Sequence, residues 1–200
     1  MEIKKRIIEQ SSSMFFRYGI RTITMDEIAE SLGISKRTLY ECFATKEDLL
    51  KECIEFQHIE NLRMREDIMK EVGDDPLEVI HRHFRHAMIV FNSINPGFFN
   101  DLQKYHSQLW HKQMESKQQE SIEFTRSIIE KAIRKGIFRK EADPDILSKA
   151  MHTFFRYISK HDIFPETQYP RAEVFRQVTL NFIRGMATIK GIQIIDEKFK

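Results

Sequence analysis

The stretch TITMDEIAESLGISKRTLYECFATKEDLL, residues 22–50, contains a dense series of helix start and stop signals. Thr24 and Glu27 have the spacing of a capping box, in which each side chain bonds the backbone amide of the other residue. Gly33 can adopt a positive φ and turn the chain, and Ser35 can cap a second short helix. The stretch therefore predicts a helix-turn-helix unit, although αα-hairpins use the same signals.

Helix signals also dominate on both sides of this stretch, whereas strand signals are nearly absent. Apolar residues recur at helical spacing up to Tyr18, and Gly19 follows as a stop signal. Longer helices are expected over about residues 45–72, from 76 to the break at 95, over 98–135 as a short and a long helix, and over 143–159 and 171–186. The polar residues 112–120 are either the junction of that short and long helix or a solvated face. The tail from Gly191 carries no clear packing signal, and the sequence as a whole predicts an all-α protein.

The composition fits a globular helical protein. The chain has 200 residues, of which 41% are hydrophobic, with 16 Phe, nine Met and few Gly and Pro. This balance excludes collagen-like and low-complexity classes. A formal net charge of +2 excludes a histone-like polycation. It does not exclude nucleic-acid binding, which needs only a local basic patch.

The sequence also gives expectations about cellular location. Cys42 and Cys53 are the only cysteines, too few for a Cys-only zinc site, and we expect both to be reduced thiols. No run approaches the ~20 apolar residues of a membrane helix. The N-terminal MEIKKRIIEQSSS lacks the continuous apolar run of a secretory signal. We therefore expect a soluble cytoplasmic protein with no membrane partner.

Several constrained positions occur in a fixed order within residues 22–50. They are Ile28-Ala29, Gly33-Ile34-Ser35-Lys36, Thr38-Leu39-Tyr40, Phe43 and Lys46-Glu47. This pattern resembles the TetR family of bacterial transcription regulators, and GIFRKEADPD at residues 136–145 resembles the family's usual entry to its dimerisation helix. The resemblance implies an N-terminal three-helix bundle with a helix-turn-helix, residues 1–47. It also implies a larger C-terminal helical domain for ligand binding and dimerisation, residues 48–200, and a homodimer on palindromic double-stranded DNA.

The second short helix is the expected recognition helix, whose first turn enters the major groove. Lys36, Arg37 and Thr38 occupy that turn. Arg37 is the best candidate for reading guanine, because its planar fork matches the O6 and N7 acceptors. Thr38 can contact a thymine methyl group or a phosphate. The alternatives are that Lys36 is only a solvated charge and that Arg37 pairs with Glu41 at i,i+4.

Four further residues suit phosphate anchoring, which fixes the register on DNA without reading sequence. They are Thr24, Ser35, Tyr40 and Lys46. Thr24 also begins a helix, whose free amides favour phosphate. The alternatives are that Tyr40 only packs in the core and that Lys46 is only a solvated charge. The core, not DNA, is the expected environment of the apolar residues Ile28, Ala29, Ile34, Leu39 and Phe43.

Aromatic and methionine side chains concentrate in the middle and late chain. Pockets in helical proteins are mostly apolar and often lie between bundle helices. The candidate lining residues for a small apolar or aromatic ligand are Met88, Phe91, Tyr105, Trp110 and Phe155. For any one of them an ordinary aromatic core position is the better interpretation, so the sequence indicates a pocket only through the set.

Two expected helices carry apolar residues suited to dimerisation. The candidate interface residues are Ile146, Leu147, Ala150 and Phe154 on one helix, and Val174, Phe175, Val178 and Phe182 on the last. The resemblance implies a four-helix interface built from two such pairs. Alternatively, part of this set faces the core of its own monomer, and we expect a mixture.

The histidine pattern and the absence of catalytic motifs from the sequence argue against metal binding and catalysis. His81, His83 and His86 do not converge on one helix face, since successive residues turn by about 100°, and two imidazoles alone make a poor zinc site. The sequence contains no nucleophile elbow, HExxH, P-loop or GxGxxG motif. We therefore expect no metal site, no cofactor and no enzymatic activity.

These observations favour a ligand-responsive repressor that binds operator DNA as a homodimer and is released by a small effector. Such a protein is expected to be nucleoid-associated in the cytoplasm. The alternative is a non-inducible architectural or protein-regulated DNA-binding factor on the same scaffold.

Overall fold

The computed structural model describes residues 2–158, 163–165 and 168–199, without the side chains of residues 96, 113–116 and 156–158. Within these ranges the regular structure is α-helical. Phe138 and Ala187 also form an isolated antiparallel β-bridge, which belongs to no strand. The predicted all-α fold is therefore confirmed. No helix among the described residues is both long and apolar enough to cross a membrane.

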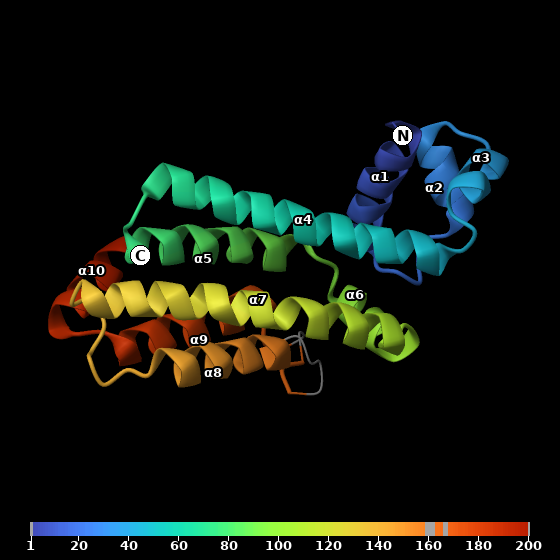
Figure 1. Cartoon of the computed structure of the whole chain (residues 1–200). Helices are drawn as coiled ribbons and strands as arrows, with labels where there is room; N and C mark the ends of the chain where they lie inside the picture. The colour runs from blue at the N-terminus through green and yellow to red at the C-terminus, as the bar shows by residue number, and fades with distance from the viewer. Residues whose placement is uncertain (1, 159–162, 166–167, 200) are drawn as a thin grey trace. The chain divides into compact units, whose positions relative to one another are not determined.

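The helices form two compact units (Figure 1). Unit 1 is drawn from residues 1–66 and 93–113, and unit 2 from residues 67–92 and 114–200. The helices of unit 1 are α1 (Glu2–Tyr18), α2 (Met25–Leu32), α3 (Lys36–Cys42), the first part of α4 (Lys46–Val72), α6 (Pro96–Tyr105) and the start of α7 (Ser107–Arg134). Within this unit α2 packs against both α1 and α3, and α6 packs against α1.

The caps that define the short helices of unit 1 form as the sequence predicts. The Thr24 hydroxyl accepts from the Glu27 amide at 3.2 Å, and the Glu27 carboxylate accepts from the Thr24 amide at 2.7 Å. These bonds from Thr24 hold the pKa of Glu27 below its usual range. Gly33 ends α2 with a φ of 64°, and the Ser35 hydroxyl begins α3 by accepting from the Thr38 amide at 3.0 Å. Local hydrogen bonds therefore fix where α3 begins.

One hydrophobic core holds unit 1 together. Its largest fully buried side chains are Phe15, Ile7, Ile20, Ile28, Leu39, Leu49, Leu50 and Leu102. Ile28, Ala29, Leu39 and Phe43 are buried and Ile34 packs against the same core, so the predicted core positions are confirmed. Leu102 lies on α6, which shows that a segment distant in sequence completes the packing of the N-terminal helices.

Unit 2 is a helical bundle with two hydrophobic clusters. Its helices are α5 (Pro76–Ser93), most of α7, α8 (Pro144–Ile158), α9 (Arg171–Met186) and α10 (Ile189–Lys198). Helix α9 packs against both α8 and α10. The first cluster joins α5, α7, α9 and α10 through Leu77, Ile129, Ile183 and Ile195, with Phe138 from the α7–α8 loop. The second surrounds Phe175 and is described with the candidate site.

Two sequence expectations need correction or completion. The tail beyond Gly191 is not without packing, because it belongs to α10, which Thr188 caps and which buries Ile195 to 1% exposure. Lys198 near its end also pairs with Glu78 of α5 at 2.5 Å. The junction of α6 and α7 falls at His106, so the polar residues 112–120 belong to the α7 helix.

Candidate functional site

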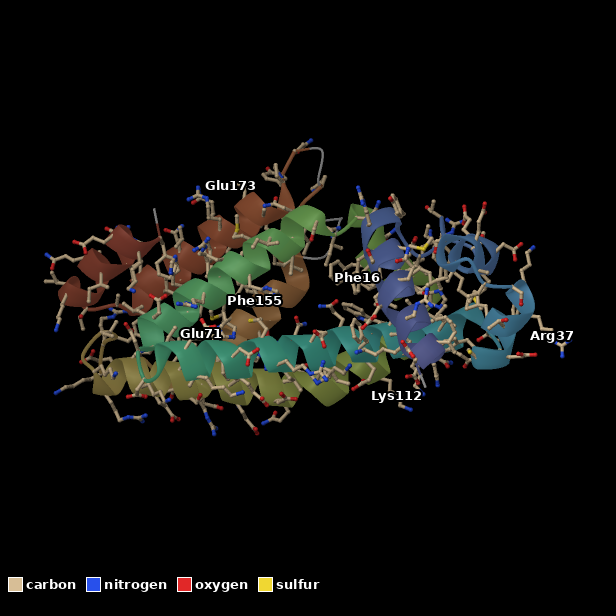
Figure 2. The ribbon with its side chains drawn as sticks, turned by 90° about the horizontal axis from the view of Figure 1, so that it is seen from above. Phe16, Arg37, Glu71, Lys112, Phe155 and Glu173 are labelled. Atoms are coloured by element: carbon tan, nitrogen blue, oxygen red, sulfur yellow. The ribbon has the colours of Figure 1, made fainter. Side chains whose placement is uncertain are left out.

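Helix α3 places its apolar and basic residues on different sides. Leu39 is fully buried and fastens the helix to the core of unit 1, whereas Lys36, Arg37 and Tyr40 are exposed. The Arg37 side chain is 88% exposed. Figure 2 shows it projecting outward from the ribbon of α3. The sequence-predicted base-reading residue is therefore on the open side of the helix.

Each basic side chain of α3 has a carboxylate partner. Lys36 Nζ lies 2.5 Å from Asp26 Oδ2 on α2, and Arg37 Nε donates to Glu41 Oε1 at 2.9 Å. The bond to Asp26 raises the pKa of Lys36. The ion pair that the i,i+4 spacing offered as an alternative role for Arg37 is thus formed in the free protein. Exposed pairs of this kind are weak, so they do not prevent a contact with DNA.

The predicted phosphate-contacting hydroxyls serve as helix caps. The Thr24 hydroxyl donates to Glu27 Oε2 at 2.8 Å, and the Ser35 and Thr38 hydroxyl oxygens share a hydrogen bond of 2.8 Å. A hydroxyl donates only one proton, so a phosphate contact from Thr24 must replace its bond to Glu27.

Lys46 begins α4 at the edge of the unit 1 core. Its Nζ lies 5.8 Å from the centre of the Phe15 ring. Partial burial lowers the pKa of Lys46, and the nearby Asp101 carboxylate opposes this shift. The side chain is half-buried, so its stem packs while its ammonium group stays near the surface.

Helix α6 is fastened to the turn between α1 and α2. The Arg21 amide donates to Asp101 Oδ2 at 3.1 Å, and the Arg21 guanidinium donates to the Tyr105 hydroxyl at 3.2 Å. At the start of α6 the Asn95 amide donates to Phe16 O at 2.6 Å. The partners lie about 80 residues apart in the chain, so no local sequence signal indicates them.

The predicted pocket residues fall into two separate groups. Tyr105 lies in unit 1 against Arg21, and Trp110 lies there 6.5 Å from Phe99 in an edge contact. Met88, Phe91 and Phe155 lie in unit 2 in the cluster around Phe175. The structure therefore brings together three of the five candidates.

Phe175 of α9 is the centre of this aromatic cluster. Its ring lies 5.6 Å from Phe84, 4.9 Å from Phe91 and 5.2 Å from Phe155. Phe84 and Phe91 come from α5, and Phe155, labelled in Figure 2, comes from α8. One turn beyond Phe175, the Thr179 side chain is 4% exposed and its hydroxyl has no hydrogen-bond partner among the described residues. Helix α9 thus carries the central ring of the cluster and, one turn further on, this buried hydroxyl.

The predicted dimer residues also divide into two groups. Ile146 is 64% exposed, Phe154 is 44% exposed, and Ala150 between them is exposed, so they form one open row on α8. The others face the interior of unit 2. Val174 and Phe175 are buried, and Leu147, Val178 and Phe182 are half-buried against the two clusters. Part of the set therefore packs inside unit 2 and part is exposed, and a dimer interface on the exposed part stays a prediction.

The helix-turn-helix region of unit 1 matches a known protein family. Residues 7–53, from α1 to the start of α4, match the family model described as bacterial regulatory proteins, tetR family. The segment from α1 to the start of α4 is therefore of the TetR type. Its α2 and α3 are the helix-turn-helix pair, and the TetR-type positions of the sequence are those that form the caps, the core and the exposed side of α3.

Individual TetR-type relatives are distant. The chain is 29% identical over 106 residues to YvaF of Bacillus subtilis, an uncharacterized HTH-type transcriptional regulator, covering 53% of this chain and 55% of YvaF. It is 24% identical over 150 residues to the HTH-type transcriptional repressor KstR2 of Mycobacterium tuberculosis, covering 70% of this chain and 72% of KstR2. The crystal structure of a transcriptional regulator from Cytophaga hutchinsonii shares the fold, with a TM-score of 0.72, 21% identity, and coverage of 92% of this chain and 98% of that chain.

Two histidines of α5 pack against aromatic rings. His81 lies 5.1 Å from the Phe199 ring, and burial lowers its pKa. His83 Nδ1 lies 2.9 Å from Val79 O and its ring lies 5.1 Å from Phe124. Among the residues described, no group of three or more His, Cys, Asp or Glu side chains is arranged to hold a metal ion.

Proposed function

We propose that this chain is a DNA-binding transcriptional repressor whose α3 is the recognition helix. The observation that carries the proposal is the arrangement of α3, in which a buried Leu39 fixes the helix while Lys36 and Arg37 project from its first turn. The relatives named above support it, since they are named as transcriptional regulators and not as enzymes.

Base reading and backbone anchoring are assigned to different residues. We propose that Arg37 contacts guanine and that Thr38 contacts a thymine methyl group or a phosphate. The anchoring contacts to phosphate come from Thr24, Ser35, Lys36, Tyr40 and Lys46. Since α3 carries few net charges, affinity for random DNA is expected to be modest, with a shallow dependence on salt.

Replacing Arg37 or Lys46 by alanine tests this assignment. Arg37→Ala is expected to remove about 1–3 kcal/mol of discrimination at one base pair of each half-site. Lys46→Ala is expected to weaken binding to all sequences alike and to reduce the salt slope by about one. Selection from a random duplex library, followed by anisotropy titrations at several salt concentrations, measures both effects. The assignment is wrong if neither substitution changes binding to any selected duplex.

We further propose that the chain acts as a homodimer through the exposed row on α8. A dimer can place two recognition helices about 34 Å apart, one turn of DNA. Ile146, Ala150 and Phe154 are spaced four residues apart, so they lie on one face of the helix. An exposed apolar row of this kind is typical of an interaction site.

Phe154→Glu is expected to raise the dimer dissociation constant by about tenfold or more, because it buries a charge at the interface. Ile189→Glu is the matched control, since Ile189 is 81% exposed and lies on α10. Sedimentation equilibrium of both variants and of the unchanged protein measures the constants. An interface on this row is contradicted if both substitutions weaken the dimer equally, or if neither substitution weakens it.

The effector site is assigned to the cluster around Phe175. Its aromatic rings suit an apolar or aromatic molecule, and the Thr179 hydroxyl supplies a hydrogen-bonding group. Such a molecule releases DNA only if it binds better to a state with low affinity for the operator. The alternative is a non-inducible factor on the same scaffold, in which the cluster is only core. Thermal melting with a panel of aromatic compounds distinguishes these two alternatives. A compound that raises the melting temperature by binding to this cluster favours the effector-responsive repressor.

A further inference from the structure

The ion pair between Arg37 and Glu41 uses a particular part of the guanidinium group. Arg37 Nε donates to Glu41 Oε1 at 2.9 Å across one turn of α3. Within the described part of the chain, the guanidinium makes this one hydrogen bond. Its two terminal nitrogens, Nη1 and Nη2, have no partner there. Glu41 thus holds the side chain by the nitrogen nearest its stem.

The terminal nitrogens are the ones needed for end-on reading of guanine. A guanidinium has five N–H donors in a rigid fork, and the Nε–H is the one that points back along the side chain. A bidentate contact with guanine O6 and N7 can use one N–H from each terminal nitrogen. A carboxylate on Nε therefore limits rotation of the fork without occupying its reading edge.

We propose that Glu41 is a positioning residue that presents the terminal nitrogens of Arg37 to a guanine. This inference rests on the proposed base-reading function of Arg37. Arg37 is highly exposed, so without a partner its long side chain samples many rotamers, and ordering it on binding costs free energy. Glu41 supplies part of that order before DNA arrives.

The second carboxylate beside α3 provides a matched comparison. Asp26 pairs with Lys36 at 2.5 Å and is exposed, as Glu41 is. An ammonium group is a compact charge with rotatable donors and no planar edge. Asp26 therefore reduces the positive charge near α3 without orienting a base-reading group. Removing either carboxylate should strengthen binding to random DNA, but only the loss of Glu41 should reduce base discrimination.

The test uses the full-length protein and a duplex selected by it from a random library. Anisotropy titrations with single-base-pair variants of this duplex first identify the pair whose preference Arg37→Ala removes. At that pair, Glu41→Ala is expected to reduce discrimination by about fivefold. Glu41→Gln should retain most of it, because the amide oxygen can still accept from Arg37 Nε. Asp26→Asn should retain it fully, while all three variants bind a random duplex about twofold to fivefold more tightly.

The outcomes separate this inference from the proposed function. If the unchanged protein selects no duplex, the proposed function is wrong and the inference falls with it. A second outcome is that a duplex is selected and Arg37→Ala removes the preference for one base pair. If Glu41→Ala then keeps this preference, only the positioning role of Glu41 is overturned. Loss of discrimination in Asp26→Asn equal to that in Glu41→Ala would also overturn it, because a general charge effect then explains both. If Arg37→Ala changes no preference, Glu41 has no reading group to position.

Discussion

Replacing Gly191 by alanine is expected to destabilise unit 2 by about 2–3 kcal/mol, because the new methyl group overlaps backbone atoms. A Cβ at this position would lie inside the contact distance of the Ile137 carbonyl oxygen and 3.1 Å from the Ala187 Cβ. That carbonyl also accepts from the Thr188 amide at 2.9 Å and from the Thr188 hydroxyl at 3.1 Å. Relieving the overlap must therefore move α10 away from the loop and disturb its N-terminal cap.

Gly185→Ala is the control for the general effect of alanine in a helix. Gly185 lies in α9, and nothing lies within 4 Å of a Cβ built there. This substitution is expected to leave stability unchanged or to raise it by up to about 1 kcal/mol. Thermal unfolding at equal protein concentration should place Gly191→Ala roughly 5–10 °C below the unchanged protein. A melting temperature equal to that of Gly185→Ala would show that α10 does not pack closely against Ile137.

The close approach at Gly191 also shows what the sequence could not predict. Thr188 and the short apolar run after it are ordinary helix signals, but a helix of 10 residues is marginal by itself. Its stability comes from burying Ile195 and from contacts with a loop some fifty residues earlier. Such contacts leave no periodic pattern, so the sequence carries no packing signal for this tail.

The helix-turn-helix region was predictable because its decisive interactions are local. Thr24 and Glu27 are three residues apart, and so are Ser35 and Thr38. The spacing alone therefore placed α2, the turn and α3, and with them the exposed position of Arg37. The contact of Arg37 with Glu41 could be raised as an alternative for the same reason, since both lie on one helix.

The candidate effector site is less predictable from the sequence. Helix periodicity shows which face of a helix is apolar, but it does not show which other helix packs against that face. Phe91 and Phe155 each lie on an apolar helix face, and the structure joins them through Phe175. Tyr105 satisfies the same sequence criterion, yet it contacts Arg21, about 80 residues earlier. Its helix face predicts Phe175 at the dimer interface, whereas its burial places it at the centre of the aromatic cluster of unit 2.

Phe175→Ala is expected to have the largest effect of any substitution considered, a loss of about 3–5 kcal/mol in the free energy of unfolding. Phe175 is 5% exposed and contacts rings from both α5 and α8, so its removal leaves a cavity where three segments meet. Phe175→Leu retains apolar volume and should cost about 1.5 kcal/mol. Urea unfolding followed by circular dichroism measures both changes. A loss near zero for Phe175→Ala would mean that the cluster is not closely packed.

The leucine variant then tests whether the cluster is also the effector site. A compound that stabilises the unchanged protein at 100 times its dissociation constant adds about 2.7 kcal/mol. If this compound lies against Phe175, Phe175→Leu should reduce its effect, because the ring contacts are lost while the fold remains. Phe138→Leu is the matched control, since Phe138 is 1% exposed in the other cluster of unit 2. If both variants lose compound binding equally, the loss reflects lower overall stability and not a contact with Phe175. Equal retention in both would place the effector away from Phe175.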